Sequence, residues 1–341
     1  MLFVNQDKRT VNLGLQGGGA HGAFTWGVLD YLLEDGRIRL EGISATSAGA
    51  MNAVILAHGL MQGGRDGART ALQTFWTAIA ASLPFETAIK GTANQPIALA
   101  PGLQAMLEFA RHFSPEQLNP FDINPLRDIL SDQVDFARLR THSPVKLFIA
   151  AANARSGKVR IFSQPDIGIE AVLASACLPT LHHTIEIDGE PYWDGGYAAN
   201  PAVFPLFQEC AASDILLVLL APRRHLDVPS TLEQIKDRMH ELAFNATFLR
   251  EMRVFASLQQ HTARTRFHFG QLERRIAKAK FHIIEPHEDM MALTSQTKLA
   301  ASQWFFEMLR DLGRAQAKAW VTQHYNGIGK RSTVDLAELF H

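Results

Sequence analysis

Two turns rich in small residues, close together near the start of the chain, constrain the fold more than any other feature of the sequence. They lie in residues 11–53, VNLGLQGGGAHGAFTWGVLDYLLEDGRIRLEGISATSAGAMNA, at Gly17–Gly22 and at Ala45–Gly49. Each turn follows a short apolar run and precedes apolar residues at helical spacing, so the stretch predicts strand, helix, strand and helix in succession. That order is typical of a parallel βαβ unit with a right-handed crossover.

The second turn has the form that a reactive serine requires. In Ala45-Thr46-Ser47-Ala48-Gly49 the serine has small neighbours, and a sharp strand-to-helix turn needs them because larger side chains would collide with the backbone. The helix that begins after Ser47 would point the positive end of its dipole at the serine and favour an anionic intermediate. The alternative is that Ser47 merely caps this helix, since serine is a common N-cap residue.

The first turn offers the backbone groups that such a serine needs. Gly17, Gly18 and Gly19 have no side chains, so their N–H groups can approach an oxyanion directly and form an oxyanion hole. Gly17, Gly19 and Gly22 also match the dinucleotide-binding pattern G-x-G-x-x-G. That pattern requires an acidic residue at the end of the second strand to bind a ribose, whereas this strand ends in the serine turn. Close packing without any chemistry is the third interpretation.

A serine nucleophile needs a proton acceptor, and one carboxylate lies in a suitable position. Asp194 follows a predicted strand and precedes two glycines in Trp193-Asp194-Gly195-Gly196-Tyr197, so the chain can turn sharply and leave the carboxylate on a tight loop. The alternative is an ordinary Asp-Gly turn, a pairing that is common in hairpins. The 14 histidines show no arrangement typical of a catalytic triad.

The rest of the chain continues the alternation of strands and helices. Because no internal repeat or linker interrupts it, we expect one α/β/α domain with a mainly parallel central sheet and a helical C-terminal third. Residues 8–222 would form the core, and residues 223–341 a mostly helical region packed on the same domain. We predict strands at 145–152, 215–220 and 281–285, a hairpin arm at 158–163, a loop at 63–67, and long helices at 232–262 and 299–324.

Composition excludes several classes of protein. The 33 basic and 34 acidic residues give a net charge of −1, so no overall field favours nucleic acid. The only two cysteines argue against a disulfide framework or a cysteine-based metal site and suit a reducing cytoplasm. The sequence shows neither a signal-peptide pattern nor an apolar run long enough to span a bilayer. We therefore expect a cytoplasmic protein, with attachment to a membrane surface left open.

Taken together, three motifs resemble those of the patatin-like phospholipase family. They are QGGGAHGA, then ATSAGAMNA one βα unit later, then WDGGYAANP, and the similarity runs from about residue 11 to 222. The resemblance implies a three-layer α/β/α fold and a Ser–Asp dyad without a catalytic histidine. Ser47 would be the nucleophile, Asp194 the base and Gly17–Gly19 the oxyanion hole.

The sequence departs from the family's pattern at two positions. The family usually has glycine where Ala45 stands, and often arginine or lysine where His21 stands. Alanine is small enough to replace that glycine, whereas the role of His21 is left undefined. Residues after about 225 carry no motif of the family.

The resulting functional hypothesis is a serine acyl-ester hydrolase. A phospholipase A or lysophospholipase would release fatty acid through an acyl-enzyme, without a metal or other cofactor. The sequence indicates no substrate-binding residues or oligomeric state. The alternatives are an esterase or depolymerase for another acyl ester or polyester, and a non-catalytic lipid-binding protein.

A lipid substrate would have to leave its bilayer, so we also expect apolar surface near the entrance to the site. Residues 84–113 hold nine large apolar residues in an irregular stretch, and they could form either such a surface or part of the core. A basic cluster could add attraction to anionic lipid or be simply solvated. This cluster comprises Arg274, Arg275, Lys278 and Lys280.

Overall fold

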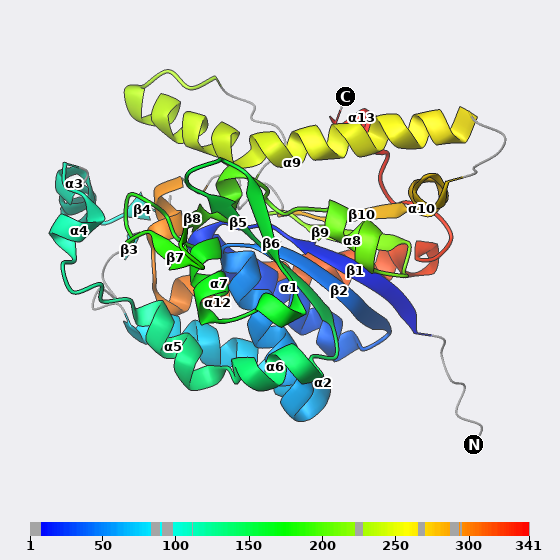
Figure 1. The fold of residues 1–341 in the computed structure, drawn as a ribbon, viewed down its shortest axis with the longest axis horizontal. Coiled ribbons are helices and arrows are strands. Elements are labelled where there is room, and N and C mark those ends of the chain that lie inside the picture. Colours follow the sequence, from blue (N-terminus) through cyan, green and yellow to red (C-terminus); the bar gives the residue numbers. More distant parts are fainter. Residues whose placement is uncertain are drawn as a thin grey trace.

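A mixed β-sheet lies at the centre of the computed structural model, which describes residues 8–82, 89–90, 98–110, 112–221, 228–264, 270–286, 293 and 295–340 (Figure 1). The strand order is β10-β9-β1-β2-β5-β8-β7, and β6 also pairs with β5. The five strands from β10 to β5 are parallel to their neighbours, whereas β6, β8 and β7 run antiparallel. The strands are β1 Arg9–Leu15, β2 Ile38–Thr46, β5 Lys146–Asn153, β6 Val159–Phe162, β7 Ile185–Ile187, β8 Glu190–Asp194, β9 Asp214–Val218 and β10 Lys280–Ile284, with β3 Ile89–Lys90 and β4 Ala98–Leu99 as a separate pair.

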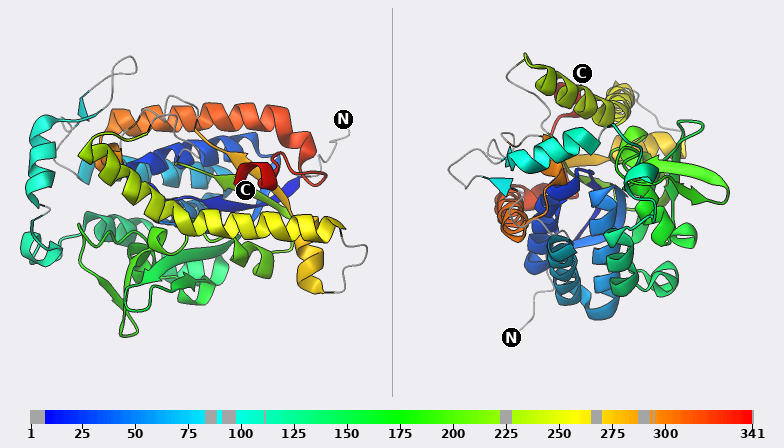
Figure 2. Two further views of the ribbon diagram at one scale, coloured as in Figure 1. Left: turned by 90° about the horizontal axis from the view of Figure 1, so that it is seen from above. Right: turned by 90° about the vertical axis from the view of Figure 1, so that its left-hand side faces the viewer.

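Helices cover both faces of this sheet, as Figure 2 shows from two further sides. None of the described helices combines the length and apolarity needed to cross a bilayer. The α-helices are α1 Gly22–Asp35, α2 Ala48–Ser82, α3 Pro101–Ala110, α4 Pro115–Leu118, α5 Pro125–Gln133, α6 Phe136–His142, α7 Ile169–Ser175, α8 Phe204–Glu209, α9 Leu232–Arg264, α10 Gln271–Lys278, α12 Gln303–His324 and α13 Leu336–Phe340. The short 3₁₀ helices are η1 Gly19–His21, η2 Gln164–Asp166, η3 Gly195–Tyr197, η4 Ser295–Leu299 and η5 Tyr325–Gly327.

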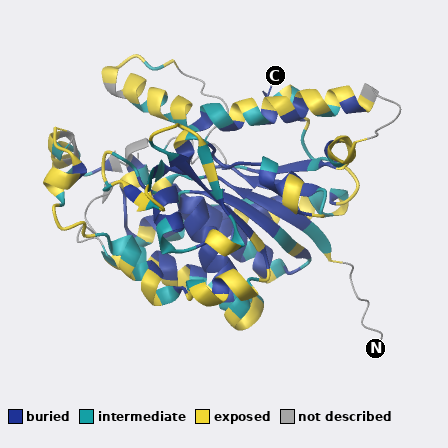
Figure 3. Ribbon diagram, in the orientation of Figure 1, coloured by how far each residue is buried: buried dark blue, intermediate teal, exposed yellow. Residues whose placement is uncertain are grey.

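The layers follow from the alternation of side chains along the buried strands. In β9, Leu216 and Val218 join the core beneath α1, α2 and α12, whereas Ile215 and Leu217 join a second core beneath α8, α9 and α13. Successive side chains of a strand point to opposite faces, so an uninterrupted apolar strand requires cover on both sides. Figure 3 shows the resulting buried sheet between partly exposed helices. The predicted three-layer α/β/α fold with a mainly parallel sheet is confirmed.

The predicted loop at residues 63–67 is wrong. Helix α2 continues through this region and is interrupted only by a kink at Gly63, with φ −145°, and Gly64, with φ 62°. Glycine adopts positive φ without the steric cost that other residues meet, so the chain changes direction here and resumes the helix at once. The glycine pair therefore marks a kink here instead of a loop.

The region after residue 223 builds on the same sheet. Strand β10 pairs with β9 in parallel, and α12 packs against α1. The two helices approach so closely that a Cβ atom on Gly27 would lie 1.9 Å from the carbonyl oxygen of Arg310, and one on Gly313 would lie 2.1 Å from that of Phe24. Glycine at both contact points is thus what lets this helix pair close over the sheet.

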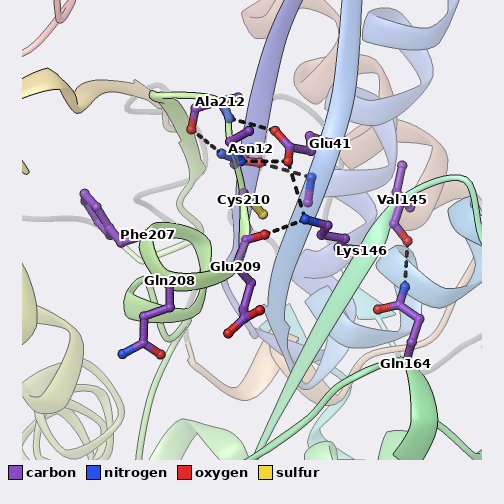
Figure 4. A network of polar contacts seen from close by, with 12 residues as sticks. Asn12, Glu41, Val145, Lys146, Gln164, Phe207, Gln208, Glu209, Cys210 and Ala212 are labelled. Atoms are coloured by element: carbon purple, nitrogen blue, oxygen red, sulfur yellow. Dashed lines mark hydrogen bonds and ion pairs between the residues drawn. The ribbon is translucent and has the colours of Figure 1, made fainter. Parts of the chain in front are cut away.

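A polar network ties the starts of the parallel strands together (Figure 4). The carboxylate of Glu41 accepts hydrogen bonds of 2.7 Å from the N–H groups of Ala211 and Ala212, and it lies 3.6 Å from the ammonium of Lys146. Asn12 donates to the carbonyl of Ala212 at 2.9 Å and accepts from Gly42 N–H at 3.1 Å. An open cavity of about 640 Å³ lies at this edge. The glycine turn and the serine turn lie at the opposite ends of these strands, where β1 and β2 end.

Candidate active site

Ser47 occupies the single residue between the end of β2 and the start of α2. Its φ of 54° is in the left-handed region, which costs a non-glycine residue about 1–3 kcal/mol. Its N–H group donates to the Ser175 hydroxyl at the end of α7, at 2.9 Å. A Cβ atom on Gly49 would lie 2.5 Å from the carbonyl oxygen of Leu15, so the turn is sharp because small residues let α2 begin directly against β1.

Asp194 reaches Ser47 through the register of the sheet. Thr46, at the end of β2, pairs with Ala150 of β5, and the next residue, Ala151, pairs with Asp194 of β8. A Cβ atom on Gly195 would lie 2.2 Å from the carbonyl oxygen of Ala150, so only glycine allows the chain after Asp194 to turn this close to β5. Two residues far apart in the sequence are therefore brought together at one edge of the sheet.

Burial strongly perturbs the carboxyl of Asp194, which is 1% exposed. Its Oδ1 atom accepts a 2.7 Å hydrogen bond from Gly196 N–H, whereas its Oδ2 atom is buried without a well-formed hydrogen bond. Loss of solvation raises the pKa of Asp194 to about 7, although the Gly196 N–H and the Ser47 hydroxyl both oppose this rise. A carboxyl with this pKa is close to equally protonated and ionised at neutral pH, as a general base requires.

The glycine turn lies directly beside Ser47. A Cβ atom on Gly17 would lie 2.7 Å from the Cβ of Ser47 and 2.9 Å from the carbonyl oxygen of Thr46. The N–H group of Gly17 donates to Oδ1 of Asn200 at 2.7 Å. Within the described ranges, the N–H groups of Gly18 and Gly19 have no acceptor. Among the three consecutive glycines, the N–H groups without an acceptor are thus those of Gly18 and Gly19.

His21 is buried behind the turn and is not part of an acid–base pair with Ser47. Its Nε2 atom lies 2.8 Å from the hydroxyl of Thr297, and its ring packs edge-on against Phe305. Burial, and then the positive charge of Lys298, lower the pKa of His21 to about 3, so the imidazole is neutral at physiological pH. In the part of the chain that the structure describes, no histidine is hydrogen-bonded to Ser47 or Asp194.

Several residues that build this site carried no functional assignment from the sequence. Gln16 accepts hydrogen bonds from Leu220 N–H at 2.6 Å and Ala221 N–H at 2.9 Å, and it donates to Asn245 of α9 at 3.0 Å. Phe244 of α9 packs against Tyr197, with ring centroids 4.6 Å apart. Helix α9 therefore rests on both the glycine turn and the turn after Asp194. Gln16 and Asn200 stand within the motifs quoted above, which was the available signal for them, whereas Ser175 lies outside these motifs.

The family model for patatin-like phospholipases matches residues 13–207, which is 195 of the 341 residues, and this match spans both turns and Asp194. The chain belongs to the patatin-like phospholipase family. Membership of this family of lipid acyl hydrolases agrees with the resemblance that the three motifs carry. No curated protein sequence matches the chain.

The search of solved structures found matches of low sequence identity. VipD from Legionella pneumophila is 16% identical with a TM-score of 0.44, over 92% of this chain and 67% of VipD. A type III effector protein, ExoU, is 15% identical with a TM-score of 0.34, over 92% of this chain and 53% of ExoU. In its complex with SpcU from Pseudomonas aeruginosa, ExoU is 14% identical with a TM-score of 0.36, over 94% of this chain and 52% of ExoU. The chain thus spans about half the length of ExoU.

Proposed function

We propose that this patatin-like protein is a serine acyl-ester hydrolase, a phospholipase A or lysophospholipase, with Ser47 as nucleophile and Asp194 as base. The observation that carries the proposal is the contact between a serine held at positive φ on a strand-to-helix turn and a fully buried carboxyl whose pKa is raised to about 7. A structural N-cap serine needs neither the strained backbone nor a buried carboxyl beside it.

The reaction proceeds in two steps on these residues. Ionised Asp194 takes the hydroxyl proton of Ser47 as its oxygen attacks the acyl carbonyl, and the proton then passes to the departing alcohol as the ester C–O bond breaks. In the second step Asp194 takes a proton from water, which attacks the acyl-enzyme. The fatty acid leaves, and the proton returns to the serine oxygen.

We propose that two of the three glycines named in the sequence hypothesis form the oxyanion hole. The Gly18 and Gly19 N–H groups would donate to the oxyanion, because among the three glycines they are the donors without an acceptor. Gly17, whose N–H is bonded to Asn200, would instead let the turn approach Ser47 without a side chain between them. Each lost oxyanion donor is expected to lower turnover by about 10²–10³.

Exposed apolar residues around the end of the molecule that holds Ser47 support contact with a lipid surface. Of the predicted stretch at residues 84–113, Leu99 is buried, but Met106, Phe109 and Phe113 are exposed, and Phe109 is 67% exposed; residues 83–88, 91–97 and 111 lie outside the described part. Further exposed apolar residues are Leu118, Phe121, Ile123, Leu232, Ile235, Met239 and Leu242.

These residues lie on α3, on the segment around α4 and on the first half of α9. All three lie at the end of the molecule opposite the start of β1, where the strands deliver Ser47 (Figures 1 and 2). Apolar surface gathered at one end, next to the site, marks a place of interaction. The basic residues around α10 lie at the other end, so we do not propose that they help this surface to bind.

The test is a hydrolysis screen of the purified protein over phospholipids, lysophospholipids, neutral glycerides and short-chain aryl esters, with Ser47→Ala as control. Release of fatty acid from phospholipids, lost in the variant, supports the proposal. Hydrolysis of only the aryl or polyester substrates would assign the protein to another class of esterase. Failure of a fluorophosphonate probe to label Ser47 would favour a non-catalytic lipid-binding protein.

A further inference from the structure

The open cavity at the start of the parallel strands has no part in the proposed hydrolysis. Its volume of about 640 Å³ is in the range of small-molecule sites. Strands β1, β2 and β5, the end of α6 and the segment that follows α6 line it. Along β2, the lining residue Glu41 lies six residues before Ser47, which is about 20 Å in a strand. The cavity is therefore separate from the candidate active site.

Three basic side chains line this cavity, and one acidic side chain does. The cations are Arg39 on β2, Arg140 on α6 and Lys146 on β5, and the acid is Glu41 on β2. The carboxylate of Glu41 already accepts two backbone hydrogen bonds and lies 3.6 Å from the Lys146 ammonium (Figure 4). Since Glu41 is paired with Lys146, the excess positive charge of the lining belongs to the two arginines.

Neither of these guanidinium groups is paired with a carboxylate of the described residues. Arg140 donates from one nitrogen to the carbonyl oxygen of Ile167 at 3.0 Å, and its other nitrogens are not used in this bond. Arg39 is exposed and makes no hydrogen bond or ion pair within the described ranges. Thr10 of β1 pairs with Arg39 in the sheet and also lines the cavity, so its hydroxyl is a further polar group there.

We propose that this cavity binds the phosphate group of a soluble organic phosphate through Arg39 and Arg140. A guanidinium presents its N–H donors in a planar fork that matches phosphate oxygens in a bidentate manner. A phosphate monoester carries a charge of about −1.5 to −2 at pH 7 and three acceptor oxygens, so it suits two cations better than a carboxylate does.

The remaining space and the position of the cavity narrow the ligand further. Apolar Leu40 and Pro144 also line the cavity, so an organic group beside the phosphate has a surface to pack against. A lipid headgroup fits this position less well, because the apolar surface proposed for lipid contact lies at the other end of the molecule (Figures 1 and 2). The proposed ligand is therefore a small phosphate ester in solution.

The experiment measures the binding of phenyl phosphate to the full chain by isothermal titration calorimetry, with benzoate as the corresponding carboxylate. Phenyl phosphate should bind more tightly than benzoate. Arg39→Gln and Arg140→Gln should each raise its Kd about tenfold, as the loss of a charge-assisted hydrogen bond predicts. Arg250→Gln, an exposed arginine of α9 that does not line the cavity, is the matched control and should leave the Kd unchanged.

Two features of the design separate binding from folding and from hydrolysis. Arg140→Gln also removes the hydrogen bond to Ile167, whereas Arg39→Gln breaks no hydrogen bond or ion pair with the described residues and should keep the parent's Tm. Ser47→Ala should bind phenyl phosphate with the parent's Kd. Because binding is measured without turnover, a failure of the proposed esterase function would not affect this result.

Four results would overturn the proposal. Absence of saturable binding of phenyl phosphate at millimolar concentrations would show that the cavity is not a phosphate site. An unchanged Kd in both arginine variants, or loss of binding in Ser47→Ala, would place the anion elsewhere. Benzoate that binds as tightly as phenyl phosphate would mean that the cavity recognises charge alone. Binding to phosphatidic acid vesicles but not to phenyl phosphate, lost in Arg39→Gln, would assign the arginines to a membrane surface.

Discussion

The pH dependence of hydrolysis tests the assignment of Asp194 most directly. A base must be ionised to accept a proton, so kcat/KM should follow the ionised fraction of the free enzyme's carboxyl. Burial raises the pKa of Asp194 from 3.8 to about 7, so the expected acidic limb has its midpoint near pH 7. An aspartate with an ordinary pKa would give a constant rate from pH 5.5 to 8.

The size of the expected fall in kcat/KM follows from the same rise in the pKa of Asp194. With a pKa of about 7, about a tenth of the carboxyls are ionised at pH 6 and about a hundredth at pH 5, so kcat/KM should fall by these factors from its plateau near pH 8.5. The rise in the pKa of Asp194 from 3.8 to about 7 corresponds to about 4 kcal/mol of preference for the protonated form in the folded state.

The shift also predicts how stability changes with pH. Between pH 3.8 and about 7 the folded state keeps a proton on Asp194 that the unfolded state releases, so the free energy of unfolding falls as the pH rises through this window. Asp194→Asn removes this loss, because asparagine does not ionise. The variant should therefore be more stable than the parent at pH 8, by up to about 4 kcal/mol, although inactive.

The assay is a pH profile of kcat/KM on a neutral aryl ester in a constant ionic-strength buffer, beside urea unfolding at pH 5 and pH 8. Glu251 must be controlled, because burial raises its pKa to about 7 as well while it accepts hydrogen bonds from the N–H groups of Val203 and Phe204. In Glu251→Gln the acidic limb of kcat/KM should remain. A limb that disappears in Glu251→Gln, or a flat profile from pH 5.5 to 8 in the parent, would refute the reasoning.

Three further outcomes are expected. Ser47→Ala and Asp194→Asn should each lower turnover by several orders of magnitude with the fold retained, and no His→Ala change outside Gly17–Gly22 should cost about 10³, since a folded variant that did so would indicate a triad. Gly18→Ala should cost about 2–4 kcal/mol of transition-state stabilisation, because the added methyl occupies the space that the substrate oxygen must enter or moves the N–H group out of line. The fold should be retained, because φ at Gly18 is 179° and the nearest atom to the added Cβ is Cδ1 of the Leu220 side chain at 2.9 Å; a rate within threefold of the parent would place the oxyanion donors elsewhere. Phe109→Ser with Phe113→Ser should slow hydrolysis of vesicles but not of a soluble ester, with exposed Leu272→Ser on α10 as matched control, whereas equal loss on both substrates with a lower Tm would show that the two rings stabilise the fold.

Local pattern was sufficient for the framework of this fold. The alternation of apolar runs and helical spacing predicted β1, β2, β5, β9 and β10, because each is a buried strand bounded in the sequence by glycine or a polar turn. The two turns were recognisable because their chemistry is local: small residues around Ser47 and three consecutive glycines. The kink in α2 was missed because a pair of glycines can either kink a helix or begin a loop. Composition therefore does not distinguish a kink from a loop.

Contacts between distant segments could not be predicted in the same way. Asn200 orients the Gly17 N–H across 183 residues, and Gln16 joins the glycine turn to Asn245 on α9 across 229 residues. Nothing in the local sequence of α9 or η4 indicates which end of the sheet it covers, because that is decided by packing against strands that come much earlier. The raised pKa of Asp194 could not be predicted from the local sequence either, since it depends on every segment that excludes water from the carboxyl.

The buried carboxyl explains how a serine could be activated without histidine. An exposed aspartate would be a poor base for a serine, because water stabilises its ionised form and keeps its pKa far below that of the proton donor. Withdrawing Asp194 from water beneath Gly196 and Phe244 raises its pKa to about 7, the range that histidine reaches unaided. A Cβ atom on Gly196 would lie 2.3 Å from Phe244, so α9 closes directly over this turn. On this reasoning the helix that follows the family's motifs takes part in setting the strength of the base.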